Sequence, residues 1–242
     1  TTLFRSVVII GSNGSGKSTL MKIISALIYP LSGKYFYKDR EINLKTLKER
    51  DVHFLIRSEI AYLFEDSDSQ LFSPTVYEEL IFGPKQLGLS DSECKKRVEA
   101  VVDMIDISDL LSRPPYTLSG GEKKKVAISS ILTSNPELIL FDEPLNNLDP
   151  RMQSFMIDLL IKLNEAGKTI IVTTHNPFII TEIDPSVVIV YPNHRVKKYE
   201  SFKDIYENEF IKAELVYEHS HFHNGLIHKH PHLFFHNHND IK

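Results

Sequence analysis

The stretch that decides the fold reads Gly11-Ser12-Asn13-Gly14-Ser15-Gly16-Lys17-Ser18, and it follows the apolar run Val7-Val8-Ile9-Ile10. Glycines spaced in this way before a Lys-Ser pair form the Walker A pattern of phosphate-binding loops. The glycines let backbone N–H groups converge on phosphate oxygens, and the N-terminus of the following helix adds partial positive charge. We therefore expect Lys17 to reach the β- and γ-phosphates of a nucleotide and Ser18 to ligate Mg²⁺. The predicted nucleotide-binding residues of this loop are Gly11, Ser12, Asn13, Gly14, Ser15, Gly16, Lys17, Ser18 and Thr19.

Two carboxylates, Asp142 and Glu143, follow the apolar run 138–141. A buried parallel strand that ends there would deliver both side chains to the sheet edge where ligands bind. We expect Asp142 to hold Mg²⁺ through its water shell and Glu143 to act as the general base on the attacking water. Carboxylates often cap strands without any such role, so the prediction depends on the phosphate-binding loop upstream.

Short apolar runs alternate with segments of helical periodicity along most of the chain. This alternation predicts an α/β fold with a parallel sheet that helices cover on both faces. Within it, the stretch 72–117 has apolar residues at helical spacing and ends in two prolines, which predicts an inserted helical subdomain. The predicted strands are 7–10, 35–37, 60–64, 138–141, 169–173 and 187–190, and the predicted helices outside the insertion are 17–27, 122–133 and 152–164.

The composition is that of an ordinary globular protein, with 242 residues, 42% hydrophobic and 25% charged. The formal net charge of −4 provides no basic field, so nucleic acid is not expected as a partner. The chain has no apolar run long enough for a membrane span, and its start is not expected to be a signal peptide. Its single cysteine, Cys94, excludes an internal disulfide, and the charged residues around it predict a helical surface position.

A third motif, Ser119-Gly120-Gly121-Glu122, opens the helix that follows the two prolines. Ser119 can cap this helix, and the glycines leave backbone N–H groups available to an anion. Taken alone, the motif would be only a helix start.

The order of these motifs, followed by His175 after the strand 169–173, resembles the nucleotide-binding domains of ABC ATPases, which have a P-loop NTPase core. The resemblance extends to about residue 190. It implies that two subunits sandwich two ATP molecules head to tail, each contacting the nucleotide of the other through its signature motif. It also implies that Asp149 belongs to the loop that links the two sites and that His175 contacts the γ-phosphate and the attacking water. The signature residues that the resemblance implies are Ser119, Gly120, Gly121 and Glu122.

A narrower resemblance lies in the segment 63–72, together with Thr75-Val76 and Phe82-Gly83-Pro84. This pattern is similar to the ATPase subunits of energy-coupling-factor importers. It implies a peripheral protein at the cytoplasmic face of the membrane that pairs with a second ATPase subunit, identical or different. It further implies an integral membrane scaffold and a small substrate-capturing membrane protein as partners, with a vitamin or a transition metal as cargo.

Two features depart from the pattern of the family. Glu65 stands where the family usually has a glutamine, and an ionised carboxylate can ligate a metal but cannot donate a hydrogen bond. We expect Glu65 to complete the γ-phosphate shell with Glu143 and His175, with altered coupling rather than lost binding. Ten residues precede Gly11, where the family has about two further strands and an aromatic residue that stacks on adenine. The N-terminal β part is therefore expected to be truncated, and Phe4 is a poor candidate for the stacking residue.

Eight of the eleven histidines lie at or beyond position 219, mostly at every second residue. In an extended segment, alternate residues share one side, so neighbouring imidazoles can chelate one ion such as Ni²⁺, Co²⁺ or Zn²⁺. An expression tag or a polar tail without a ligand is the alternative, although a tag is normally an unbroken run. The predicted ligands are His219, His221, His223, His228, His230, His232, His236 and His238.

The sequence as a whole predicts an ABC ATPase domain over 1–216 and a histidine-rich tail over 217–242. We expect an ATP- and Mg²⁺-dependent motor subunit of a cobalt or nickel importer. One alternative is the same type of ATPase in vitamin uptake. Others are a soluble ABC ATPase that acts on DNA or ribosomes, and a metal-storage role in which the tail dominates. The chain has neither a coiled-coil insertion nor a second copy of the motifs, which argues against the soluble classes.

Overall fold

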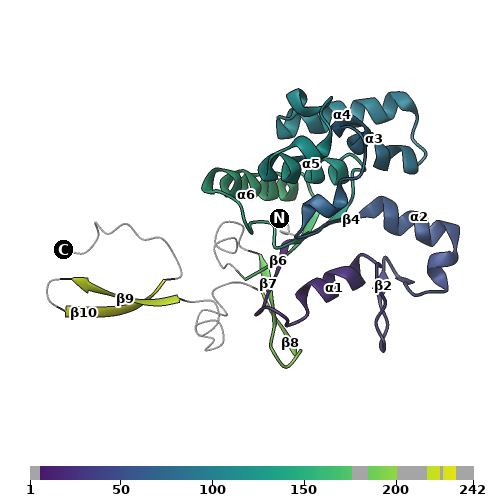
Figure 1. Cartoon of the computed structure of the whole chain (residues 1–242). Coiled ribbons are helices and arrows are strands. Elements are labelled where there is room, and N and C mark those ends of the chain that lie inside the picture. The colour runs from purple at the N-terminus through teal and green to yellow at the C-terminus, as the bar shows by residue number, and fades with distance from the viewer. Residues whose placement is uncertain (1–5, 176–184, 201–216, 224–225, 233–242) are drawn as a thin grey trace. The chain divides into compact units, whose positions relative to one another are not determined.

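The computed structural model describes residues 6–175, 185–200, 217–223 and 226–232 (Figure 1). The chain divides into two compact units, one of Thr1–Lys17 with Thr173–Lys242 and the other of Ser18–Val172. Within the described residues, no helix is both long and apolar enough to cross a bilayer.

The unit Ser18–Val172 contains a parallel strand pair, β4 (Ile60–Leu63) and β5 (Leu138–Asp142). All five residues of β5 are buried, as expected for a parallel strand covered on both faces. The register pairs Tyr62 with Leu140 and Leu63 with Phe141. The carboxyl end of β5 therefore delivers Asp142 to the same edge at which β4 ends, as the sequence predicted.

Most of the described helices belong to this unit. In several of them, the side chain of the residue before the helix accepts a hydrogen bond from a backbone N–H of the first turn. Asp149 precedes α6 (Pro150–Glu165), and its carboxylate accepts a hydrogen bond from the backbone N–H of Met152 at 2.9 Å. Such caps satisfy backbone donors that have no partner within the helix. The other elements of the unit, apart from the lobe described next, are α1 (Lys17–Ile24), which begins at the unit boundary, β2 (Phe36–Tyr37), β3 (Arg40–Glu41), η1 (Thr46–Lys48), α2 (Arg50–Glu59) and η2 (Ser67–Gln70).

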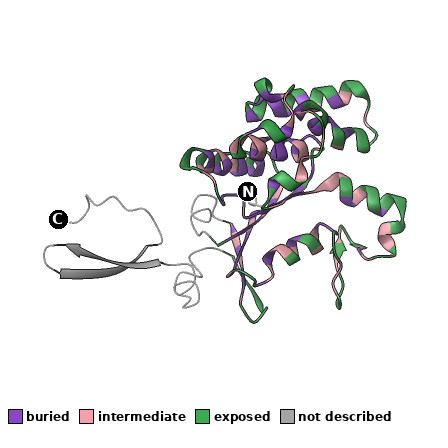
Figure 2. Ribbon diagram, in the orientation of Figure 1, coloured by how far each residue is buried: buried purple, intermediate pink, exposed green. Residues whose placement is uncertain are grey.

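A helical lobe is formed by α3 (Val76–Gln86), α4 (Asp91–Ile105) and α5 (Gly120–Leu132), with η3 (Ser108–Leu110) and η4 (Pro115–Thr117) between α4 and α5. Each long helix carries a buried stripe and an exposed stripe (Figure 2). The helices α3 and α4 lie within the stretch 72–117, and the Thr75 side chain caps α3. The helix that was predicted at 122–133, outside the insertion, is α5, which packs with α3 and α4. The bounds of the insertion stay a prediction.

One prediction about the lobe was wrong. Cys94 is completely buried in α4, and its thiol contacts the carbonyl of Leu89 at 3.6 Å. The cysteine lies one turn before Val98, on the same face as Val101 and Ile105, so helical periodicity places it in the core despite its charged neighbours in sequence.

The interior of α3 contains Pro84, which cannot donate the hydrogen bond that a helical residue gives to the carbonyl four residues earlier. That carbonyl belongs to Leu80, and the Thr133 hydroxyl, just after α5, donates to it at 2.8 Å. A Cβ added at Gly83 would lie 2.4 Å from Ser134 Oγ. Proline and glycine therefore allow α3 and the end of α5 to pack closely.

The unit of Thr1–Lys17 and Thr173–Lys242 contains β1 (Ser6–Ile10), which runs parallel to β7 (Ser186–Val190). A further strand, β8 (Val196–Tyr199), pairs with β7 in the antiparallel direction. The strand β6 (Thr169–Thr174) begins in one unit and ends in the other. The predicted strands 7–10, 169–173 and 187–190 are thus confirmed, whereas α2, β3 and β8 were not predicted.

Part of the histidine-rich segment forms an antiparallel hairpin of β9 (Tyr217–His223) and β10 (Leu226–His232). The backbone register places His219 opposite His230 and His221 opposite His228. His236 and His238 lie outside the described residues. The proposed boundary between residues 216 and 217 stays a prediction.

Replacing a core leucine will test the burial of β5. Leu140→Ala removes a completely buried side chain and is expected to lower the free energy of unfolding by about 2–5 kcal/mol. Leu31→Ala is the matched control, because Leu31 is fully exposed and its truncation is expected to cost less than about 0.5 kcal/mol. Urea unfolding followed by circular dichroism measures both, and equal losses would contradict the assignment of β5 to the core.

Candidate functional site

The phosphate-binding loop predicted from the sequence lies between β1 and α1. Gly14 and Gly16 have φ angles of 80° and 105°, a region of backbone conformation that residues with a side chain rarely adopt. The Lys17 ammonium is almost completely buried and donates to the carbonyls of Gly11 and Ser12 at 2.8 and 3.3 Å. The loop therefore wraps around its own lysine, with the backbone shape that the glycines permit.

Gly11 is required by a close approach of other atoms. A Cβ at this position would lie 2.4 Å from the carbonyl oxygen of Val190 and 2.6 Å from Ser15 Oγ. The Ser15 hydroxyl is buried and, among the described residues, has no hydrogen-bond partner. A buried hydroxyl inside a glycine-rich loop with a buried lysine suits an anionic ligand that accepts hydrogen bonds.

Asp142 joins the start of α1 and the strand β4 by hydrogen bonds. Its carboxylate is 3% exposed and accepts hydrogen bonds from Ser18 Oγ at 3.2 Å and from the Tyr62 hydroxyl at 2.7 Å. Burial raises the pKa of Tyr62 well above its ordinary value, and the hydrogen bond to Asp142 adds to that rise. Ser18 and Asp142, the two residues predicted to hold Mg²⁺, are thus in direct contact although 124 positions separate them.

Tyr62 was not predicted as a site residue. Its hydroxyl is a polar group in an otherwise apolar strand, and that is the signal which could have identified it. A buried tyrosine hydroxyl needs a hydrogen-bond partner, and the carboxylate at the end of the neighbouring strand supplies one.

Glu143 follows β5 directly and is 6% exposed. Its φ angle is 45°, the left-handed region that is unfavourable for a residue with a side chain. Its carbonyl accepts a hydrogen bond from the backbone N–H of Asn146 at 3.1 Å. A strained backbone held by its surroundings is a common feature of functional sites.

Glu65 follows β4 at the same edge of the sheet. One carboxylate oxygen accepts a hydrogen bond from the Asn146 side chain at 3.1 Å. The Gln70 side chain fixes the strand end, because its oxygen accepts from the Phe64 N–H at 2.9 Å and its amide donates to the Tyr62 carbonyl at 2.9 Å. The glutamine of this segment is therefore committed to the backbone, and Glu65 is the group that faces the loop after β5.

The signature motif forms a complete capping box at the start of α5. Ser119 Oγ accepts from the Glu122 N–H, and the Glu122 carboxylate accepts from the Ser119 N–H at 2.7 Å. The hydrogen bonds to Ser119 hold the pKa of Glu122 below its ordinary value, and the Arg113 guanidinium at 3.2 Å also lowers it. Because glutamate and glutamine can both close a capping box, glutamate at position 122 is compatible with the motif.

The other predicted site residues are Asp149, His175 and Thr19, and their positions are as follows. Asp149 caps α6, and His175 is exposed directly after β6. Thr19 lies in the first turn of α1. Ser18 and Asp142 are two predicted residues from distant parts of the unit Ser18–Val172 that a hydrogen bond joins.

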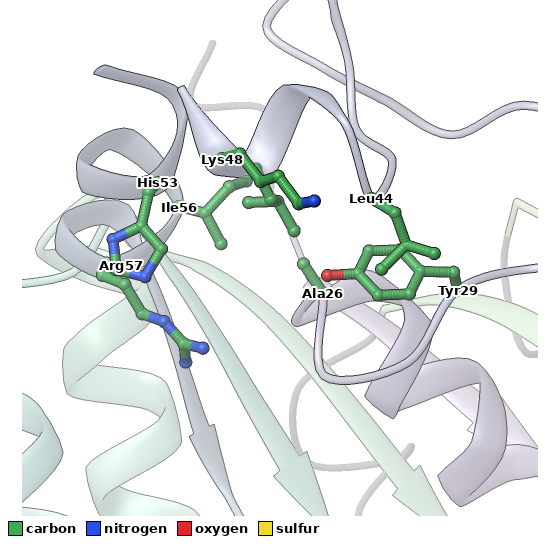
Figure 3. Close-up of a pocket in the computed structure, with 8 residues that line it drawn as sticks. Ala26, Tyr29, Leu44, Lys48, His53, Ile56 and Arg57 are labelled. Atoms are coloured by element: carbon green, nitrogen blue, oxygen red, sulfur yellow. The ribbon is translucent and has the colours of Figure 1, made fainter. Parts of the chain in front are cut away.

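A cavity of about 330 Å³ lies elsewhere in the unit Ser18–Val172 (Figure 3). Its apolar wall includes Ala26 and Ile56, and His53 and Arg57 of α2 stand at its edge. None of its lining residues belongs to the predicted nucleotide site, so this hollow is not the nucleotide pocket.

Comparisons with known proteins agree with this geometry. The chain matches the ABC transporter family over residues 4–146. It is 41% identical to a putative ABC transporter ATP-binding protein of Methanosarcina acetivorans, over 89% of this chain and 80% of that protein. It is 39% identical to the nickel import ATP-binding protein LarO of Lactiplantibacillus plantarum, over 87% of each chain.

Solved structures of ABC transporter ATP-binding subunits are also similar to this chain. CbiO1 of Clostridium perfringens, part of the ABC transporter complex CbiONQ, is 32% identical and superimposes with a TM-score of 0.72, over 86% of this chain and 82% of that one. The dimeric cassette MJ0796 in a post-hydrolysis state with ADP and phosphate is 28% identical, with a TM-score of 0.71 over 82% of this chain and 87% of that one.

Two glycine substitutions will test whether Gly11 is tightly packed in its loop while Gly121, at the start of α5, has free space around it. Gly11→Ala is expected to lower the free energy of unfolding by about 1–3 kcal/mol, because its Cβ would overlap one backbone oxygen, of Val190, and one side-chain oxygen, of Ser15. Gly121→Ala meets nothing within 4 Å and is expected to leave stability unchanged or to raise it by up to about 1 kcal/mol. Thermal unfolding of both variants provides the test, and a neutral Gly11→Ala would show that the loop packs differently.

Proposed function

The chain belongs to the ABC transporter family as an ATP-binding and ATP-hydrolysing subunit, and we propose that it drives the import of nickel or cobalt ions. The likeness to a nickel import ATP-binding protein and to CbiO1 supports this cargo. The histidine-rich segment adds independent support, because imidazole is a preferred ligand of both ions.

The loop 11–19 is proposed to bind the phosphates of the nucleotide, and Ser18 with the end of β5 is proposed to hold the accompanying Mg²⁺. The buried Ser15 hydroxyl and the Lys17 ammonium would bind phosphate oxygens together with the loop N–H groups. Ser18 and Asp142 would hold Mg²⁺, and their direct contact at 3.2 Å is consistent with two ligands of one small ion. The ion would neutralise charge on the phosphates.

Glu143 is proposed as the general base that takes the proton of the attacking water. Its burial and its fixed backbone angle restrict where the carboxylate can point. Glu65 and His175 would complete the surroundings of the γ-phosphate, and the Asn146 side chain would orient Glu65.

A second ATPase subunit is proposed to complete the site with its own signature motif, Ser119-Gly120-Gly121-Glu122, and Asp149 would link the two sites. The capping box rigidifies the start of α5, where exposed backbone N–H groups can meet an anion. A membrane scaffold and a substrate-capturing protein would be the other partners, which would place the chain at the cytoplasmic face of a membrane.

The hairpin of β9 and β10 is proposed to bind a transition metal. Its register places His219 opposite His230 and His221 opposite His228, and directly opposed residues of antiparallel strands have Cα atoms about 4.5–5.5 Å apart. Two pairs of histidines thus come together in the folded backbone. The segment would concentrate or sense the metal rather than power its transport.

Substitution of the proposed base tests the nucleotide chemistry. Glu143→Gln is expected to lower kcat for ATP hydrolysis by about 10²–10⁴-fold while ATP binding persists, because an amide cannot accept the proton of water. Lys17→Ala is expected to weaken ATP binding itself. Phosphate release and nucleotide binding by purified protein measure the two effects, and substantial turnover by Glu143→Gln would exclude Glu143 as the base.

Cellular metal content tests the cargo. Cells that carry Lys17→Ala are expected to accumulate less nickel or less cobalt than wild-type cells at trace external metal. Equal amounts of the subunit in the two strains would exclude a loss of expression as the cause. Unchanged nickel and cobalt would contradict the metal-importer proposal and favour a vitamin as the cargo.

A further inference from the structure

Lys124 is an unusual residue of α5, because it is a lysine in the core of the lobe. It is 4% exposed, and lysine is almost never fully buried unless it is paired. Its ammonium donates one hydrogen bond, to the carbonyl oxygen of Glu65 at 3.2 Å. An ammonium has three N–H donors, so this bond uses one of them.

Three carboxylates act electrostatically on Lys124. Burial lowers the pKa of Lys124, and the carboxylates of Glu65, Asp142 and Asp66, in that order, act in the opposite direction. Glu65 and Asp66 lie on the segment after β4, and Asp142 ends β5. The lysine therefore places a positive charge beside the acidic end of the sheet, from a helix that begins with the signature motif.

We propose that Lys124 is a positioning residue that supplies the buried counter-charge for Glu65 and Asp142, and so holds the segment after β4 in the position that ATP hydrolysis requires. This inference rests on the proposed nucleotide site. It concerns a residue that neither touches the nucleotide in our assignment nor belongs to any motif considered above.

The need for a counter-charge follows from Glu65. A glutamine at this position would add no charge, whereas glutamate brings a carboxylate to an edge that already carries Asp142 and the buried Glu143. Like charges at short range in a poorly solvated site repel strongly. Asn146 gives the Glu65 carboxylate one hydrogen bond but no charge. Lys124 provides the charge, and its bond to the Glu65 carbonyl fixes the backbone.

A neighbouring lysine provides a contrast. Lys123 also joins α5 to the segment after β4, through an ion pair with Asp68 at 2.6 Å, but the Asp68 side chain is 54% exposed. Water and salt screen such a surface pair, which typically contributes little. Of these two adjacent lysines, Lys124 provides a buried positive charge, whereas Lys123 forms an ion pair with an exposed carboxylate.

A double-mutant cycle tests the inference. Lys124→Met keeps the apolar volume of the side chain and removes its charge, and it is made in the wild-type chain and in Glu65→Gln. We expect Lys124→Met to lower kcat for ATP hydrolysis at least tenfold when residue 65 is glutamate, but at most about threefold in the Glu65→Gln chain. KM for ATP is expected to stay within threefold, because the phosphate-binding loop is untouched.

Lys123→Met is the matched control, with the same substitution on the same helix, and it is expected to change kcat less than twofold. Equal losses of kcat from Lys124→Met in both chains would overturn the inference, since a lysine that serves only as a hydrogen-bond donor to the backbone acts alike beside glutamate and glutamine.

The free energy of unfolding provides a readout that needs no ATP hydrolysis. Lys124→Met is expected to be more destabilising beside Glu65 than in the Glu65→Gln chain, because the attraction between the two charges is lost only in the former. Additive effects would overturn the counter-charge. A coupled unfolding cycle in a wild-type chain that does not hydrolyse ATP would support the counter-charge and contradict the proposed nucleotide chemistry, so the two failures are distinguishable.

Discussion

The structure of the unit Ser18–Val172 depends on one buried carboxylate. Asp142 ends a strand whose residues are all buried, and a charged group in such a place is costly unless hydrogen bonds surround it. Ser18 supplies one bond from the start of α1, and Tyr62 supplies another from β4. A single carboxylate therefore joins three segments that are distant in sequence. The residues proposed to hold Mg²⁺ are the same ones that secure this arrangement.

The helix α5 connects several parts of this unit. Its first turn is closed by the Ser119–Glu122 capping box, its middle contributes the buried Lys124, and the residue after its end bonds to the Leu80 carbonyl of α3. A rigid helix transmits a displacement of one end to the other. Contacts at the signature motif and at the Glu65 segment are thus made by one stiff element.

The chemistry of the nucleotide and the identity of the cargo have different physical origins in this chain. The proposed phosphate site uses glycine backbone angles and a buried lysine, which one unbroken stretch of chain provides. The proposed cargo rests on a different part of the chain. The hairpin register, which brings histidines of two strands opposite one another, is the feature of this chain with the chemistry of a transition metal.

The sequence by itself determined the elements whose cause is local. The glycine spacing of the loop 11–18, the capping of α5 by Ser119 and the fully apolar strand before Asp142 follow from backbone sterics and from contacts within a few residues. The tertiary structure alone decided the position of Cys94, the partner of Tyr62 and the burial of Lys124, because each depends on residues from other elements. Charged neighbours in the sequence suggested a surface position for Cys94, and helical periodicity overrode them. Lys124 stands among three lysines that look alike in the sequence, and only the packing of α5 against the strand ends distinguishes the one whose charge is buried.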